Sequence, residues 1–222
     1  METLKDLGRE YERRFAATAP YREKVWKVLL QAFLQPLVPP RATVLDLGCG
    51  WGEFIRNVRA DRRLAMDLNP EMPQRVGSGV ETIQQDCSAP WRIEDASLDL
   101  VFTSNFFEHL PDKDALRRTL MEARRCLKPG GLLICLGPNI RYLHGAYWDF
   151  WDHFVPLTDR SLTEILTLSG FAVERVEPRF LPYTMSQGFN PPVFLLRVYL
   201  RMPLLWRFFG RQFLVIARRI EG

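Results

Sequence analysis

The 222-residue chain has few cysteines and histidines, and these shortages limit the disulfides and metal sites that it can contain. Its four cysteines show no C-x-x-C spacing, and three of them fall in or beside apolar runs, where a reduced thiol behaves as a small hydrophobe. We therefore expect no disulfide framework and a reducing, cytoplasmic compartment. The three histidines are not spaced with other residues as metal ligands are, so the sequence predicts no metal.

Long apolar runs and a strong charge imbalance are also missing. No stretch of about 18 uncharged apolar residues is present, so we expect no segment that spans a membrane. Residues 1–6 contain no hydrophobic signal region, and we expect no secretory leader. The net charge of +4 permits an anionic partner without requiring one. Because the basic residues do not follow a polar face, an RNA-binding function is disfavoured.

Residues 44–53 read Val-Leu-Asp-Leu-Gly-Cys-Gly-Trp-Gly-Glu, a short apolar run that ends in Gly48, Gly50 and Gly52. A buried strand that ends in glycines and leads into a helix brings backbone N–H groups against a ligand. The spacing is G-x-G-x-G, which differs from the G-x-G-x-x-G of dinucleotide binders. Asp46 would repel a pyrophosphate and attract a cationic amine. The loop therefore suits S-adenosylmethionine, which carries an ammonium and a sulfonium, better than NAD.

Two further acidic residues lie at the ends of the next expected strands. Asp67 follows the glycine loop at the separation in sequence that is typical of a carboxylate that accepts hydrogen bonds from ribose hydroxyls. An aspartate before Asn-Pro is also a common turn former, which is the alternative. Asp86 follows the third expected strand, and it could instead cap its own loop at Ser88.

With these residues in place, the sequence resembles the class I S-adenosylmethionine-dependent methyltransferases over roughly residues 40–178. The resemblance implies an α/β, Rossmann-like, doubly wound fold: a mostly parallel seven-stranded sheet with its last strand antiparallel and helices on both faces. It rests on the motif segments 44–52, 85–87, 99–110 and 127–131, together with Asp67. By the same resemblance the cofactor-binding residues are Asp46, Gly48, Cys49, Gly50, Gly52, Asp67, Leu68, Asp86, Cys87, Ser104 and Asn105.

Apolar periodicity places the remaining elements. We expect an N-terminal helical cap over 1–40, formed by helices at 3–18 and 21–37, and a cofactor-binding domain over 41–222 with a loop-helix insertion at about 179–211. The expected strands are 43–47, 63–67, 80–84, 97–103, 132–137, 171–176 and 213–218. The expected helices are 51–60, 112–127 and 158–169, with a helix or turn at 70–76. In the cap, Tyr21, Arg22 and Trp26 are candidates for contact with the ligands.

The connection 138–157 is rich in aromatic residues and follows the carboxyl end of the fifth expected strand, which places it over the ligand crevice. A hydroxyl acceptor benefits from a general base, and His153 and His109 are the candidates for that role or for acceptor contact. A histidine that only satisfies a buried hydrogen bond is the alternative for each.

Residues 193–209 read as an apolar helix that carries Arg197, Arg201 and Arg207 toward one side, with Pro203 as an interruption. Such a helix can lie at a membrane surface, with its arginines at the head groups. Packing against the chain's own core, or against a second subunit in a homodimer, is equally compatible with the pattern.

The sequence thus favours an enzyme that transfers a methyl group from S-adenosylmethionine, leaving S-adenosylhomocysteine, to an oxygen of a small-molecule, sugar or lipid-linked acceptor. Residues 108–110, Glu-His-Leu, resemble the small-molecule and lipid branch, and the Asn-Pro-Pro-Tyr motif of DNA base methylation is missing. We expect no DNA partner. Two alternatives stay open: a cofactor-binding interaction protein without turnover, and an RNA methyltransferase.

Overall fold

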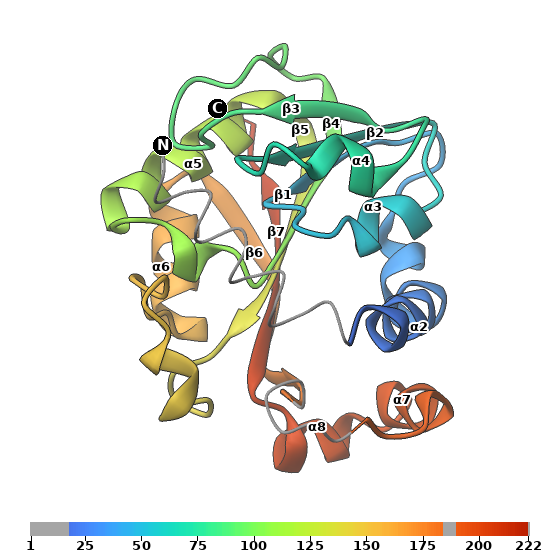
Figure 1. Ribbon diagram of the computed structural model, residues 1–222. Coiled ribbons are helices and arrows are strands. Elements are labelled where there is room, and N and C mark those ends of the chain that lie inside the picture. Colours follow the sequence, from blue (N-terminus) through green and yellow to red (C-terminus); the bar gives the residue numbers. More distant parts are fainter. Residues whose placement is uncertain (1–17, 184–189, 222) are drawn as a thin grey trace.

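The computed structural model describes residues 18–183 and 190–221 (Figure 1). The helix expected over 3–18 therefore lies, apart from its last residue, outside the described residues. The expected fold class is confirmed by one seven-stranded sheet in the order β3-β2-β1-β4-β5-β7-β6. Strands β1 to β5 pair in parallel, and β7 is antiparallel to both β5 and β6. The strands are β1 Thr43–Leu47, β2 Arg62–Asp67, β3 Glu81–Gln84, β4 Leu98–Ser104, β5 Leu127–Pro138, β6 Phe171–Leu181 and β7 Gln212–Arg219.

Helices cover both faces of this sheet (Figure 1). One core cluster gathers the apolar residues of α5 and α6 against the sheet, and a second gathers those of α2, α3, α7 and α8 against the opposite face. The α-helices are α2 Ala19–Leu29, α3 Glu53–Asn57, α4 Met72–Val76, α5 Lys113–Cys126, α6 Asp159–Leu168, α7 Val193–Leu200 and α8 Pro203–Phe209. The shorter turns are η2 Leu30–Leu34, η3 Gln35–Leu37, η4 Phe107–His109 and η5 Ala146–Asp149.

Local sequence signals explain where α5 and α6 begin. Asp112 precedes α5, and its carboxylate accepts a 2.7 Å hydrogen bond from the Ala115 backbone N–H, as an N-cap does. At the start of α6, the side chains and backbone groups of Thr158 and Ser161 bond reciprocally in a capping box. Gly170 ends α6 with a φ of 81°, a conformation that glycine adopts without steric cost.

Two expected boundaries are wrong for identifiable reasons. The helix expected over 51–60 spans only Glu53–Asn57, because Val58 adopts an extended conformation and is buried in the core. The strand expected over 132–137 is longer, because residues 127–131 already belong to β5. That strand begins at Leu127, which pairs with Leu98 before a register shift, so the segment forms an irregular start of the strand.

The C-terminal insertion holds two helices, separated at the interruption that Pro203 predicts. α7 ends at Leu200 and α8 begins at Pro203, which opens the helix at a position where its missing N–H costs nothing. The break turns the two helices differently, so the apolar residues of the segment do not share one covered face. Leu200 and Trp206 are buried against the domain. The side chains that stay most exposed include Phe194 (64%), Leu204 (70%) and Phe208 (72%).

Candidate functional site

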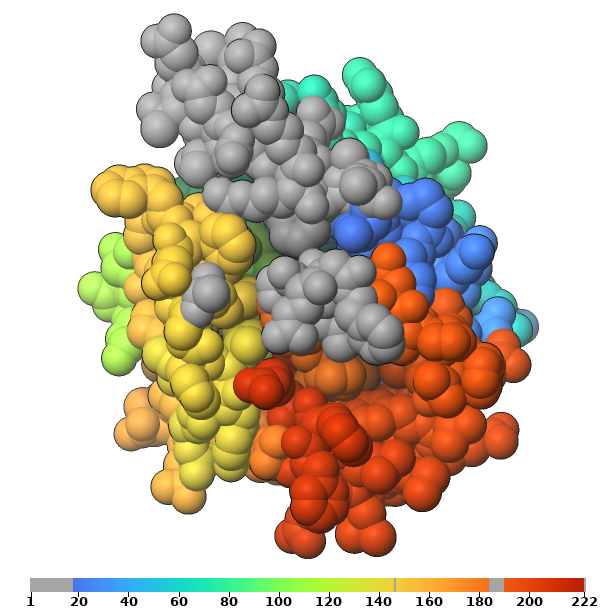
Figure 2. Space-filling view, turned by 60° about the horizontal axis from the view of Figure 1, so that its bottom comes forward, coloured from blue at the N-terminus to red at the C-terminus, as the bar shows by residue number. Residues whose placement is uncertain are grey.

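A pocket of about 120 Å³ opens at the carboxyl ends of β1 and β4, where the strand order reverses. The connection 138–157 (yellow) and the helices α7 and α8 (orange to red) lie on the same face of the molecule (Figure 2). The pocket lining contains eight of the residues expected at a site: Asp46, Gly48, Cys49, Gly50, Ser104, Asn105, His109 and His153. Arg22 and Trp26 of α2, two of the three candidate ligand contacts of the cap, also line it, whereas Tyr21 lies outside the lining and donates a hydrogen bond to the Pro191 oxygen.

The glycine loop that follows β1 needs its glycines for geometric reasons. Gly48 has a φ of 67°, and a Cβ at this position would overlap the ring of Phe106. Gly50 has a φ of 53°, and its backbone N–H donates a 2.8 Å hydrogen bond to Oδ2 of Asp67. The loop is thereby bent and tied to the end of β2, and its backbone lines the pocket.

Asp46 places a buried carboxyl group beneath this loop. Burial, followed by the nearby charge of Glu53, raises the pKa of Asp46 well above its ordinary value. Glu53 itself is paired with Arg22, whose Nε donates a 2.9 Å hydrogen bond to Oε1 of the glutamate. A cation in the pocket would reverse the unfavourable environment of Asp46, so this end of the pocket suits a positively charged ligand.

Five expected cofactor contacts lie outside the pocket lining: Gly52, Asp67, Leu68, Asp86 and Cys87. Asp67 also accepts a hydrogen bond from the Asn69 backbone N–H, at 2.9 Å, and is linked to the pocket through Gly50. The Asp86 carboxylate accepts a 2.8 Å hydrogen bond from the Ser88 backbone N–H, the loop-capping contact that was the alternative for it. Cys87 is buried, with Sγ 3.4 Å from Thr119 Oγ1, and burial raises the pKa of this thiol to about 11.

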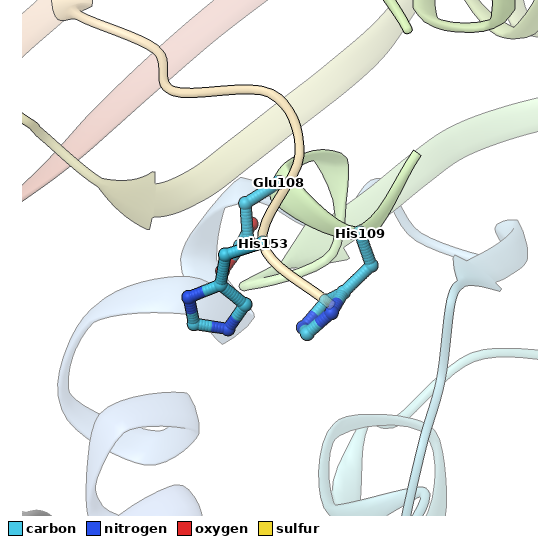
Figure 3. Close-up of side chains that lie close together, drawn as sticks. All are labelled: Glu108, His109 and His153. Carbon is cyan, nitrogen blue, oxygen red and sulfur yellow. The ribbon is translucent and has the colours of Figure 1, made fainter. Parts of the chain in front are cut away.

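At the other end of the pocket, His109 and His153 line the wall, and the buried Glu108 lies close to both of them but outside the pocket lining (Figure 3). The rings of the two histidines meet edge to face, with centroids 4.8 Å apart. Nδ1 of His109 lies 2.9 Å from the backbone oxygen of Asp152 and 3.2 Å from its Oδ2. Nδ1 of His153 lies 2.6 Å from the backbone oxygen of Tyr147. The Tyr147 hydroxyl donates a 2.5 Å hydrogen bond to Oε1 of Glu108.

The two histidines have pKa values that move in opposite directions. Burial lowers the pKa of His109, but the hydrogen bond that the ring donates to Asp152 and the charges of Glu108 and Asp152 outweigh it, so the pKa is raised. Burial lowers the pKa of His153, and the neighbouring charge of His109 lowers it further. The hydrogen bond that Asp152 accepts from His109 lowers the pKa of Asp152, so this carboxylate is ionised at physiological pH. His153 is the member of the pair that stays neutral at physiological pH.

The sequence profile of the methyltransferase domain family matches residues 18–176, most of the chain. The chain belongs to the class I S-adenosylmethionine-dependent methyltransferases. The match begins in the N-terminal cap and ends within β6, so it contains both ends of the pocket described above.

Individual methyltransferases resemble the chain to different extents. It is 31% identical to 2-methyl-6-phytyl-1,4-hydroquinone methyltransferase of Synechocystis sp., over 61% of this chain and 45% of the relative. It is 27% identical to malonyl-[acyl-carrier protein] O-methyltransferase of Methylococcus capsulatus, over 82% of this chain and 69% of the relative. The solved structure of a methyltransferase from Archaeoglobus fulgidus superposes with a TM-score of 0.68 at 21% identity, covering 92% of this chain and 99% of the other. The chain spans about half the length of the first curated relatives it matches, between 42% and 63%.

The residues present fit the cofactor of this methyltransferase family. Asp46 places a buried carboxyl group in the pocket that a cationic ligand would help to ionise, and the bent loop at Gly48 and Gly50 exposes backbone beside it. Asn105 adds a buried side-chain oxygen, Oδ1, that has no hydrogen-bond partner in the described residues. Such an oxygen gains stability when a ligand donates to it.

Sequence reasoning missed several residues that the fold brings to the pocket. Glu53 and Asp152 lie next to predicted motif residues, and only the tertiary structure turns their side chains toward the site. Glu108 is almost fully buried beneath the histidine pair, although its neighbour His109 was predicted. The adjacency of a glutamate and a histidine after the fourth strand was the one available signal for Glu108. The third histidine, His144, is exposed and does not line the pocket.

Proposed function

We propose that the chain transfers the methyl group of S-adenosylmethionine to an oxygen of a small acceptor that carries an apolar, lipid-like portion. The observation that carries this proposal is the arrangement of the pocket: a carboxyl group and glycine loop at one end and a histidine pair at the other. The cofactor supplies an electrophilic methyl group that leaves a neutral thioether. The chain's own residues must hold the acceptor in line with that methyl and manage one proton.

The cofactor end is assigned to Asp46, Gly48, Cys49 and Gly50, with Ser104 and Asn105 on the neighbouring strand end. Asp67 is assigned to the ribose, because it lies at the end of β2 and is fixed by the backbone N–H groups of Gly50 and Asn69. The outer contacts of the cofactor are assigned to Gly52, Leu68, Asp86 and Cys87. The Cys87 contribution is limited to its backbone, since its thiol faces Thr119.

The acceptor end is assigned to His109 and His153. Each Nδ1 faces an oxygen that only accepts hydrogen bonds, so Nδ1 carries the ring proton. In the neutral ring the lone pair is then on Nε2, which makes no hydrogen bond within the described residues. An acceptor hydroxyl held against the neutral His153 can give its proton to Nε2 while its oxygen bonds to the methyl carbon.

Two observations support an acceptor with an apolar portion. Trp26, Phe54 and Phe102 form an aromatic wall of the pocket, with Phe54 stacked on Phe102 at 3.9 Å and Trp26 edge-on to Phe102 at 5.8 Å. The Synechocystis relative acts on a phytyl hydroquinone, and the Methylococcus relative methylates an oxygen. Hydroquinones that carry an isoprenoid tail combine the hydroxyl and the apolar portion that this pocket suits.

The exposed side chains of α7 and α8 support delivery of such an acceptor from a membrane surface. Phe194, Leu204 and Phe208 are exposed together with Arg201 and Arg207, a combination of apolar and cationic groups that matches the boundary of an anionic bilayer. No described helix is long and apolar enough to cross a membrane. The proposed contact is therefore peripheral, on the face that also carries the connection 138–157 (Figure 2).

The test is methyl incorporation from labelled S-adenosylmethionine. The acceptors to compare are prenylated hydroquinones, their tail-free analogues, glycolipids, nucleotide sugars and RNA. We expect transfer to a tailed hydroxyl acceptor, a lower rate with the tail-free analogue, and a large loss in His153→Ala. His144→Ala is the matched control, because His144 is exposed and lies outside the pocket. Cofactor binding without transfer to any of these classes would favour an interaction protein without turnover, and transfer to RNA alone would overturn the acceptor class.

A further inference from the structure

Three side chains at the acceptor end offer metal-ligand atoms to the same point. One donor atom from each of Glu108, His109 and His153 lies within 4.8 Å of the other two (Figure 3). The first two sit at η4, directly after β4, and the third comes from the connection 138–157. The sequence did not predict a metal because these residues are not spaced as a linear motif.

We infer that Glu108, His109 and His153 form a site for a divalent transition-metal ion. Two imidazole nitrogens and one carboxylate oxygen are the protein ligands of many catalytic zinc sites, which leave a further position open to water or substrate. Such a set also suits other first-row ions, since imidazole and carboxylate bind most of them. The site rests on the proposed function, because the open position would face the acceptor hydroxyl.

The surroundings of the three side chains match those of metal ligands. A metal-binding histidine donates its second ring N–H to a carboxylate or a backbone oxygen, which fixes the tautomer and orients the ring. Nδ1 of His109 meets both kinds of oxygen on Asp152, and Nδ1 of His153 meets the backbone oxygen of Tyr147. The Tyr147 hydroxyl holds Oε1 of Glu108, which leaves Oε2 of that carboxylate for an ion. Each of the three ligands thus has its supporting hydrogen bond.

The distances require only side-chain adjustment. Donor atoms around a tetrahedral ion with bonds of about 2.0–2.1 Å lie about 3.3 Å apart. The present span of 4.8 Å is larger, so a bound ion would have to draw the three side chains closer together, and the rings of His109 and His153 are only partly buried. Glu108 is buried, so its carboxylate gains a compensating charge when an ion is bound.

A bound ion would act on the acceptor rather than on the methyl donor. An acceptor hydroxyl at the open position would lose its proton more readily, because the ion stabilises the oxyanion. The oxygen then bonds to the methyl carbon as the carbon–sulfur bond breaks, and the proton leaves to solvent. Without the ion, the neutral His153 is the proton acceptor assigned above, so metal dependence decides between these two roles of the same cluster.

The binding test uses Zn²⁺ alone, titrated calorimetrically into chelator-treated protein without methyl donor or acceptor. We expect one ion per chain in the wild type and in His144→Ala. Affinity should fall at least about 100-fold in His109→Ala and His153→Ala, and about 10- to 100-fold in Asp152→Asn, which removes a supporting carboxylate. Circular dichroism verifies that each variant is folded. If a histidine variant is not folded, Glu108→Gln is tested instead, because it removes the charge of one ligand and keeps the shape of the buried side chain. The inference is overturned if the wild type binds no stoichiometric Zn²⁺, or if the ligand variants bind it as the wild type does.

A second readout separates this site from the cysteines. Co²⁺ bound by nitrogen and oxygen ligands shows visible d–d bands without the intense near-ultraviolet band of a cobalt–thiolate bond. We expect that spectrum in the wild type and its loss in His153→Ala; a thiolate band would overturn the assignment. Because neither measurement uses methyl transfer, failure to bind metal leaves the proposed function standing, and failure of methyl transfer leaves the metal site standing.

Discussion

The backbone N–H of Gly50 donates a 2.8 Å hydrogen bond to the carboxylate of Asp67, so the glycine loop and this acidic residue form one unit in space. The bond links the loop after β1 to the end of β2. The same carboxylate retains lone pairs for ligand hydroxyls, because an ionised carboxylate can accept about four hydrogen bonds. Changes at either residue should therefore affect cofactor binding first.

Asp67→Ala should weaken S-adenosylmethionine binding by about 1.5–3 kcal/mol, the scale for losing a charged hydrogen-bond partner. The measurement is calorimetry of the cofactor. Asp114→Ala is the matched control: its carboxylate is exposed on α5 and does not line the pocket, so we expect no loss. Wild-type affinity in Asp67→Ala would remove this residue from the ribose site.

Gly50→Val should abolish cofactor binding while the protein stays folded. Gly50 lines the pocket with a φ of 53°, so a branched side chain is strained there and occupies ligand space. Gly130→Val is a useful control, because that glycine also has a positive φ but faces open space far from the pocket. Detectable binding by Gly50→Val, measured on protein with a native circular dichroism spectrum, would contradict the prediction.

Cofactor affinity should fall as the pH is lowered toward the raised pKa of Asp46. The sign follows from the charge: burial and Glu53 favour the neutral carboxyl, whereas a cationic ligand binds the ionised form. Cofactor binding should therefore release a proton at pH values above 3.8, the ordinary pKa of an aspartate, as long as Asp46 is still protonated in the free protein. Calorimetry in two buffers with different ionisation enthalpies measures that proton. Asp46→Asn should bind more weakly and lose the release, and an unchanged proton count in this variant would assign it to another group.

Leu200 and Leu204 provide a matched pair for the C-terminal helices. Leu200→Asn should destabilise the fold by about 1–3 kcal/mol, because Leu200 is buried and an unpaired amide would be buried in its place. Leu204→Asn should leave the free energy of unfolding within about 0.5 kcal/mol, since that side chain is exposed. Denaturant unfolding of both variants measures the difference, and equal effects would mean that the exposure of Leu204 is not preserved in solution.

Sedimentation with anionic vesicles tests the proposed membrane contact. Vesicles should recruit the wild type, each arginine adding about 1 kcal/mol at low salt. Glutamine at positions 197, 201 and 207 should release the protein, and Leu204→Asn should weaken binding without unfolding it. As a control for total charge, glutamine at the exposed Arg117 and Arg118 of α5 should change little. If both sets of substitutions weaken vesicle binding equally, the interaction depends on net charge alone and not on α7 and α8.

The sequence alone determined the fold class and pointed to the glycine loop and Asp46 that line the pocket, because both depend on short-range patterns. Short apolar runs that alternate with amphipathic helices specify parallel strands and their crossovers, and a glycine loop with Asp46 and Asp67 at fixed spacing is a local signal. The break of the C-terminal helix at Pro203 was predictable for the same reason, since proline acts on its own backbone and that of its neighbours.

Only the tertiary structure decided which residues meet at the acceptor end and which faces of α7 and α8 are covered. His109 and His153 come from segments on either side of α5 and β5. Glu108 lies close to both of them, and its carboxylate accepts a hydrogen bond from the Tyr147 hydroxyl. Leu200 is buried while Leu204 is exposed, because a two-residue break reorients the second helix. Contacts between distant segments depend on how whole elements pack, and periodicity within one element carries no information about its orientation toward another.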